Sequence, residues 1–266
     1  MRYILLFIAI FTFSCKYNIT SPVGTIKDYS ANSGKLFYTS SGDSDDNIET
    51  TLKKNKHSLG IYKIVVLGGD STTILTNIKK VLNKNPHFNN VEIDLSQTEI
   101  PEIPKEMFTN TTNLGKITLP DTVKKIEEKA FSGCSSLSYI RFSGGLTNIG
   151  TNAFSNCSAL TVLLLPDGLT TIEKCAFSGC SSLVNLFLPK SLTKIDNDAF
   201  KKCSLLNNVE YLGMENKLTG CSPFSNGSNP SNLYLPNVET GKTNEFNTKC
   251  FLGKKDWKIT KGHIPS

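Results

Sequence analysis

Apolar residues recur along most of this chain at a fixed spacing of 23 residues. Leucine opens five successive units, and an aliphatic residue follows three positions later; an Ile, an Ala-Phe pair and a Cys complete each of the first four units. The consensus, with x for variable positions, is LxxIxLPxxLxxIxxxAFxxCxx. Chance does not align so many columns, so the chain is a tandem-repeat protein. The opening leucines are Leu114, Leu137, Leu160, Leu183 and Leu206.

The unit length is in the range of leucine-rich repeats, which predicts an α/β solenoid with a parallel, concave β-sheet. Leu-x-x-Ile-x-Leu is the expected strand, and the following Pro ends it because Pro has no N–H to donate. The Ala-Phe segment is expected to form a short turn of helix on the opposite side. No unit can bury its own Phe, so stacked units must share one internal column. Its predicted members are Phe131, Phe154, Phe177 and Phe200.

Four of the eight cysteines also occupy a single column of the repeat. Equivalent side chains in stacked units lie about 4.8 Å apart, which is too far for a disulfide and too straight for tetrahedral zinc. We therefore interpret these four as small buried apolar residues: Cys134, Cys157, Cys180 and Cys203. Cys175 stands at an exposed repeat position and is a candidate free thiol. Whether Cys221 and Cys250 pair stays open.

Both ends of the array carry units of a different kind. Residues 45–90 contain an expected strand from Ile61 to Leu67 and an apolar helical stripe from Ile74 to Leu82. Together with the next strand they predict a βαβ unit that caps the first repeat. The solenoid is expected over 91–240. A C-terminal cap is expected over 241–266, built on Phe251, Leu252, Trp257 and Ile259.

The N-terminus has the pattern of a targeting segment. A basic start precedes an apolar run from Ile4 to Phe13, which is about half the length that a membrane span requires. Cys15 follows at once, as in the lipobox of bacterial lipoproteins. We expect a signal peptide over 1–14, lipidation of Cys15 and a flexible tether over 15–44, which is rich in Ser, Thr, Asn and Gly. Ordinary secretion and an uncleaved anchor remain alternatives.

Charge and catalytic motifs add little. The net charge of +6 over 266 residues does not by itself predict a nucleic-acid partner, and the N-terminus argues against one. His57, His87 and His263 are scattered, there is no Gly-x-Ser-x-Gly motif, and Gly68-Gly69-Asp70-Ser71 lacks the Lys of a phosphate-binding loop. We therefore expect no enzymatic activity, no cofactor and no metal.

Alternation along the strands predicts which side chains face outward on the sheet. The third and fifth strand positions point out, and in the middle units these positions are unusually apolar. Aromatic and Arg side chains are typical of binding hot spots, although the same residues also suit any β-sheet. The candidate binding residues are Tyr139, Arg141, Val162, Leu164, Asn185, Phe187 and Tyr234.

The repeat, the variant Ile100-Pro101-Glu102-Ile103-Pro104 and the closing FLGKKDW resemble the BspA-like (Treponema pallidum-type) leucine-rich-repeat proteins. Members are typically surface or envelope proteins of host-associated bacteria, and several are adhesins. The resemblance implies a lipid-anchored envelope protein, on the outer surface rather than in the periplasm. It also implies a protein ligand from host matrix or from a bacterial surface.

Two main functional hypotheses follow, beside a third in which the chain is an enzyme or a carrier. In the first, a monomer attached to the membrane only through its lipid binds macromolecules through the concave face, as an adhesin does. In the second, the chain is a structural or scaffold protein of the bacterial envelope without a host ligand. The ligand itself is not predicted.

Overall fold

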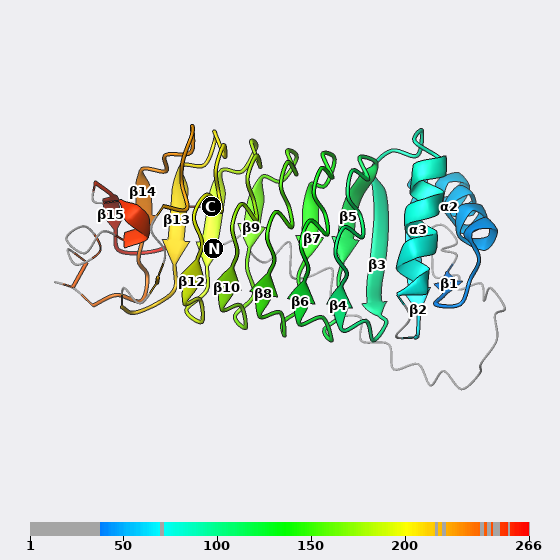
Figure 1. Cartoon of the computed structure of the whole chain (residues 1–266), viewed down its shortest axis with the longest axis horizontal. Coiled ribbons are helices and arrows are strands. Elements are labelled where there is room, and N and C mark those ends of the chain that lie inside the picture. Colours follow the sequence, from blue (N-terminus) through cyan, green and yellow to red (C-terminus); the bar gives the residue numbers. More distant parts are fainter. Residues whose placement is uncertain are drawn as a thin grey trace.

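The computed structural model describes residues 38–69, 72–215, 218–219, 222–239, 242–243, 246, 251–254 and 256–265. The predicted signal peptide, Cys15, Cys221 and Cys250 lie outside these residues. The described chain winds into coils that stand side by side along the long axis of the molecule (Figure 1).

Each coil contributes one strand, usually of three to seven residues, to the main side of the solenoid, and the paired strands are parallel. The first five strands form one ladder, in the order β1 (Thr39–Ser40), β2 (Lys63–Leu67), β3 (Val91–Gln97), β5 (Leu114–Thr118) and β7 (Tyr139–Arg141). The next five form a second ladder, with β9 (Val162–Leu164), β11 (Asn185–Leu188), β13 (Asn208–Tyr211), β14 (Asn232–Tyr234) and β15 (Lys258–Thr260). The prediction of a leucine-rich-repeat solenoid is confirmed.

A second parallel sheet, which the sequence analysis did not predict, runs along another side of the coils. Its strands are only two residues long, and neighbouring strands in the sheet are 23 residues apart along the chain. Each carries one fully buried Ile that points into the interior. The strands are β4 (Glu102–Ile103), β6 (Lys125–Ile126), β8 (Asn148–Ile149), β10 (Thr171–Ile172) and β12 (Lys194–Ile195).

The Ala-Phe segments form successive turns and not the predicted turn of helix. Backbone N–H groups donate alternately within the turn and to the next coil: Ala130 N donates to Glu127 O (3.2 Å), whereas Phe131 N donates to Ala153 O (2.7 Å). Left-handed residues make this alternation possible, such as Lys129 (φ 54°) and Gly133 (φ 76°). The helix prediction was wrong because it allowed only for hydrogen bonds within the segment.

The phenylalanine rings stack in one internal column. From Phe108 through Phe131, Phe154, Phe177 and Phe200, successive ring centroids are 5.0–5.4 Å apart and the rings are nearly parallel. All five side chains are fully buried. Phe224 continues the column from Phe200 with a tilted ring at 5.9 Å. Each coil therefore buries its ring against those of its neighbours.

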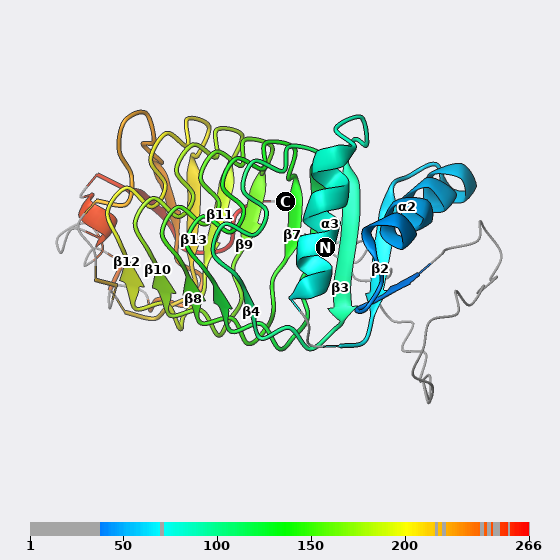
Figure 2. The ribbon, with the colours of Figure 1, turned by 45° about the vertical axis from the view of Figure 1, so that its right-hand side comes forward.

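The N-terminal unit contains the expected strand, helix and strand, in the form of β2, α3 (Thr73–Lys84) and β3. It also contains a helix that was not predicted, α2 (Asp45–Leu59), which buries Ile48 and Leu52 and ends at Gly60 (φ 73°). Figure 2 shows both helices at one end of the row of coils. The predicted tether extended too far, because Thr39 and Ser40 already pair with Val66 and Leu67.

The C-terminal region buries three large side chains and adds a strand to the main ladder. Phe251, Leu252 and Trp257 are buried, and the Trp257 indole N–H donates to Phe251 O (3.1 Å). Strand β15 then pairs with β14 and extends the main sheet by one strand. The main sheet therefore continues past residue 240, where the solenoid was predicted to end.

Candidate functional site

The candidate site is the row of side chains that point outward from the long strands, which we call the outer strand face. Its members come from the third and fifth positions of each Leu-x-x-Ile-x-Leu segment or its equivalent, and backbone pairing aligns them from coil to coil wherever the ladder is continuous. The outer strand face comprises Lys116, Thr118, Tyr139, Arg141, Val162, Leu164, Asn185, Phe187, Asn208, Glu210, Asn232 and Tyr234.

An apolar patch lies in the middle of the outer strand face. Leu164 is 64% exposed, and Tyr139 and Val162 are each 44% exposed. Phe187 is half-buried and stands in register with Leu164 on the neighbouring strand. Solvated apolar side chains next to one another are unfavourable unless something covers them. We call Tyr139, Val162, Leu164 and Phe187 the apolar patch.

Arg141 lies at the edge of the apolar patch. Its guanidinium donates to Leu119 O and to an Asp121 carboxylate oxygen, both at 3.4 Å. The Asp121 side chain is largely exposed, so this ion pair holds the guanidinium weakly. The arrangement leaves a cation beside an apolar surface, a pairing that is common at protein interfaces.

Three asparagines form a hydrogen-bonded ladder beside the apolar patch. Asn208 Nδ2 donates to Asn185 Oδ1 (2.8 Å), and Asn232 Nδ2 donates to Asn208 Oδ1 (2.7 Å). Side-chain amides that bond to one another in this way are held in a single orientation. The predicted site residue Asn185 is thus part of a rigid polar stripe.

Glu210 occupies an outward position of the outer strand face, but it does not face solvent. Its side chain is almost completely covered, because the C-terminal tail crosses the outer strand face at this point. Glu210 Oε1 lies 2.6 Å from His263 Nδ1, and Glu210 Oε2 accepts a hydrogen bond from Ile264 N (2.8 Å). Tyr234 stands in register with Glu210 and is half-buried. Sequence periodicity carries no signal for this contact, because the tail lies outside the repeat.

The column cysteines are buried free thiols. Each Sγ donates to the carbonyl of a Phe 26 residues earlier, as Cys157 does to Phe131 O (3.1 Å) and Cys203 to Phe177 O (3.2 Å). Burial raises the pKa of Cys134 and of Cys203 from 9.0 to about 12, and raises the pKa of Cys157 and Cys180 as well. Neutral thiols are poor nucleophiles, so this column stabilises the coils and offers no reactive group. Cys175 is a free, half-buried thiol outside the column.

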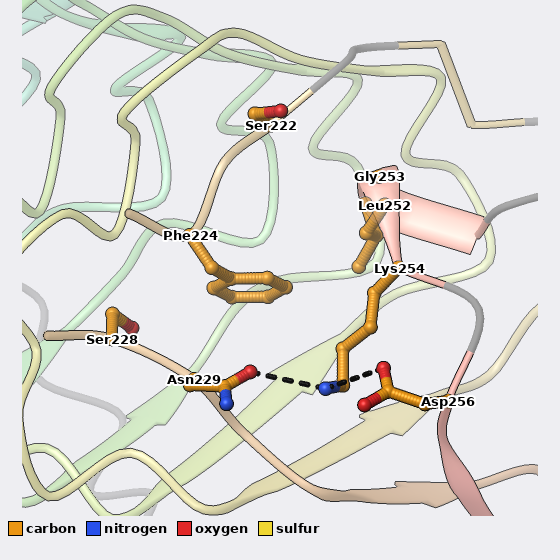
Figure 3. Close-up of a pocket in the computed structure, with 8 residues that line it drawn as sticks. All are labelled: Ser222, Phe224, Ser228, Asn229, Leu252, Gly253, Lys254 and Asp256. Atoms are coloured by element: carbon orange, nitrogen blue, oxygen red, sulfur yellow. Dashed lines mark hydrogen bonds and ion pairs between the residues drawn. The ribbon is translucent and has the colours of Figure 1, made fainter. Parts of the chain in front are cut away.

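A pocket of about 270 Å³ lies in the C-terminal region, away from the predicted residues (Figure 3). Phe224 and Leu252 line it together with Lys254, whose ammonium donates to Asn229 Oδ1 (3.0 Å) and pairs with Asp256 (2.8 Å). The hydrogen bond from Lys254 lowers the pKa of Asp256. Because the Lys254 charge is already neutralised, the pocket presents no unpaired ionic group to a ligand.

Two further properties concern the described residues as a whole. No group of three or more His, Cys, Asp or Glu side chains in this part of the chain is arranged to hold a metal ion. Neither α2 nor α3 has the length and apolar character that crossing a membrane requires.

A family model described as the BspA type leucine rich repeat region matches the chain in six copies, over residues 101–229 and 154–264. Together these matches span more than half of the sequence. The chain belongs to this family. Leucine-rich-repeat domains generally mediate protein–protein binding, so membership in the BspA-type family supports a protein-binding repeat protein.

Solved structures that match the chain include three bacterial proteins. The Treponema pallidum protein TpLRR is 24% identical over 65% of this chain and 86% of its own, with a TM-score of 0.45. The pneumococcal vaccine antigen PcpA is 18% identical over 66% of this chain and 42% of its own, with a TM-score of 0.54. A leucine-rich-repeat protein from Bacteroides ovatus is 18% identical over 91% of this chain and 77% of its own, with a TM-score of 0.39. No curated protein matches the chain.

Proposed function

We propose that this protein is a lipid-anchored protein of the bacterial cell envelope that binds a protein ligand through the outer strand face. The ligand class is extracellular-matrix protein of a host or a surface protein of another cell, so the biological role is adhesion. The proposal includes no enzymatic activity, and it treats the protein as a monomer.

The observation that carries this proposal is the exposure of the apolar patch. Leu164, at 64% exposure, stands beside Phe187 on the next strand, and Val162 lies on the strand of Leu164. Burying apolar surface yields about 25 cal/mol per Å², so a partner that covers these side chains gains binding energy without any change of fold. The neighbouring asparagine ladder supplies aligned amides for orientation.

Binding of the purified chain to immobilised extracellular-matrix proteins tests the ligand part of the proposal. Leu164→Ser is expected to weaken binding at least tenfold, because a central anchor contributes more than about 1.4 kcal/mol. The melting temperature should stay within a few degrees of wild type, since Leu164 is mostly solvated. Unchanged binding of Leu164→Ser, or no matrix binding by the wild type, would count against the adhesin role.

Protease treatment of intact cells tests the location separately. On the outer surface, the repeats are expected to be cleaved together with known surface proteins, and Cys15→Ala is expected to abolish incorporation of labelled fatty acid. Protection of the repeats in cells whose other surface proteins are digested would favour a periplasmic scaffold role instead.

A further inference from the structure

The C-terminal tail, residues 261–265, lies on the outer strand face in the manner of a bound peptide. It leaves β15 at Thr260, and His263 already contacts Glu210 on β13, two strands away. Two strand spacings amount to about 9.6 Å, and three extended residues span about 10 Å. The tail therefore runs across the strands toward β13 and does not continue alongside β15.

Glu210 is the anchor of this contact. Both of its carboxylate oxygens are engaged by the tail, one by the His263 ring and the other by the Ile264 N–H. Glu210 is only 3% exposed, whereas the His263 side chain is 71% exposed. The Glu210 carboxylate is thus buried between the outer strand face and the tail, whereas the His263 side chain that covers it is mostly solvated.

The tail has the features of a segment that can leave. Lys261, His263 and Pro265 are exposed, Ile264 is half-buried, and the chain bends at Gly262, whose φ is 137°. A segment that is held by a few hydrogen bonds and buries little apolar surface opens at low free-energy cost compared with the core. If the tail left, Glu210 would be exposed in the same cross-strand row as Phe187 and Leu164 of the apolar patch.

The cross-strand row of outward side chains continues directly from Glu210 into the apolar patch. Glu210 is in register with Phe187 on β11, and Phe187 is in register with Leu164 on β9. A peptide that follows the path of the tail crosses Tyr234 on β14 and reaches the Glu210 carboxylate, and beyond it lie two apolar side chains, one strand spacing apart.

We infer that the outer strand face binds an extended polypeptide segment that crosses the strands, and that the C-terminal tail is the resident occupant which such a partner displaces. The segment carries a histidine or another cationic donor at Glu210, followed by apolar residues on Phe187 and Leu164. The inference rests on the proposed function and specifies the partner: a linear protein segment, not a folded surface.

A synthetic peptide with the sequence of residues 260–266, labelled with a fluorophore, is the probe for this inference. In the double variant His263→Ala, Ile264→Pro, the tail loses both hydrogen bonds with Glu210. The residues of the outer strand face are unchanged. Fluorescence anisotropy should show at least tenfold tighter peptide binding to this variant than to wild type, because a tethered tail competes at an effective concentration near the millimolar range.

Adding Glu210→Gln to the double variant should reduce the peptide affinity to the wild-type level or below. Glu239→Gln, which changes an exposed carboxylate outside the outer strand face, is the matched control and should have no effect. Equal affinity for wild type and the double variant, or unchanged affinity with Glu210→Gln, would overturn the inference. A wild-type dimer that Glu210→Gln dissociates would also overturn it, since the tail would then bridge two copies. None of these measurements uses a matrix protein, so they can succeed where the adhesin role fails.

Discussion

Phe177 lies in the middle of the phenylalanine column, with the rings of Phe154 and Phe200 on either side at 5.1 and 5.4 Å. Phe177→Ala is expected to lower the free energy of unfolding by about 3–5 kcal/mol, because it leaves a cavity between two coils that cannot close. Urea denaturation measures the change. Leu164→Ala, at an exposed position, is the control and should cost about 0.5 kcal/mol or less. Equal costs for the two variants would contradict the stacked column.

The column cysteines predict a loss of stability at alkaline pH. Burial raises the pKa of these thiols above the ordinary value of 9.0, to about 12 for Cys134 and Cys203. The folded chain therefore keeps protons that the unfolded chain releases above pH 9, so the contribution to stability is complete below pH 9 and is lost as the pH rises toward 12. Urea midpoints between pH 8 and 11 should fall less steeply for Cys157→Ala than for wild type. Parallel curves would show that the thiols ionise equally in both states.

At the scale of the element, the turn segments depend on residues with left-handed backbone. Gly133 has φ 76°, and a Cβ added there would lie 2.2 Å from Asn110 Oδ1 of the preceding coil. Gly133→Ala is expected to cost about 1–3 kcal/mol in unfolding free energy. The second change Asn110→Gly should restore part of the loss by removing the clash. Gly144→Ala is the matched control, because nothing lies near its added Cβ. A cost for Gly133→Ala no greater than that of the control would refute this account of the turns.

The periodic elements were predictable because one physical requirement, such as burial or strand alternation, determines which residue recurs at each position of the repeat. A Phe that recurs every 23 residues must be buried, and Leu-x-x-Ile-x-Leu alternates as a strand does. The second sheet was missed because two-residue strands such as Lys125–Ile126 are too short to show a period. Helix α2 offered a weak signal, with Ser44 as N-cap and Gly60 at its end, but few apolar residues between them.

The candidate site was predictable only in part. The outward positions follow from strand alternation, so Tyr139, Val162 and Leu164 were placed on one face from the sequence alone. The coverage of Glu210 by the tail was not predictable, because His263 is 53 residues away along the chain and belongs to no repeat. Contacts between a repeat and a non-repeated segment leave no periodic trace in the sequence.

At the scale of the whole molecule, neighbouring coils are joined by the main ladder, by the second sheet and by the phenylalanine column. These connections are not all continuous along the solenoid. The main ladder of backbone pairs is interrupted between β7 and β9, whereas the second sheet and the phenylalanine column run past this point without a break. The apolar patch lies across the interruption, with Tyr139 on one strand and Val162 and Leu164 on the next. The interior and the turns therefore hold the coils together where the outer strand face is most exposed.

Site-specific photo-crosslinking tests most directly whether the outer strand face is the binding surface. A benzophenone amino acid would replace Leu164 in one variant and Lys174, which is exposed on the turn side of the same coil, in another. Each purified variant is irradiated with host matrix extract, and adducts are identified by mass spectrometry. We expect protein adducts from position 164 and none above background from position 174. Adducts from position 174 alone, or equally from both, would contradict the account.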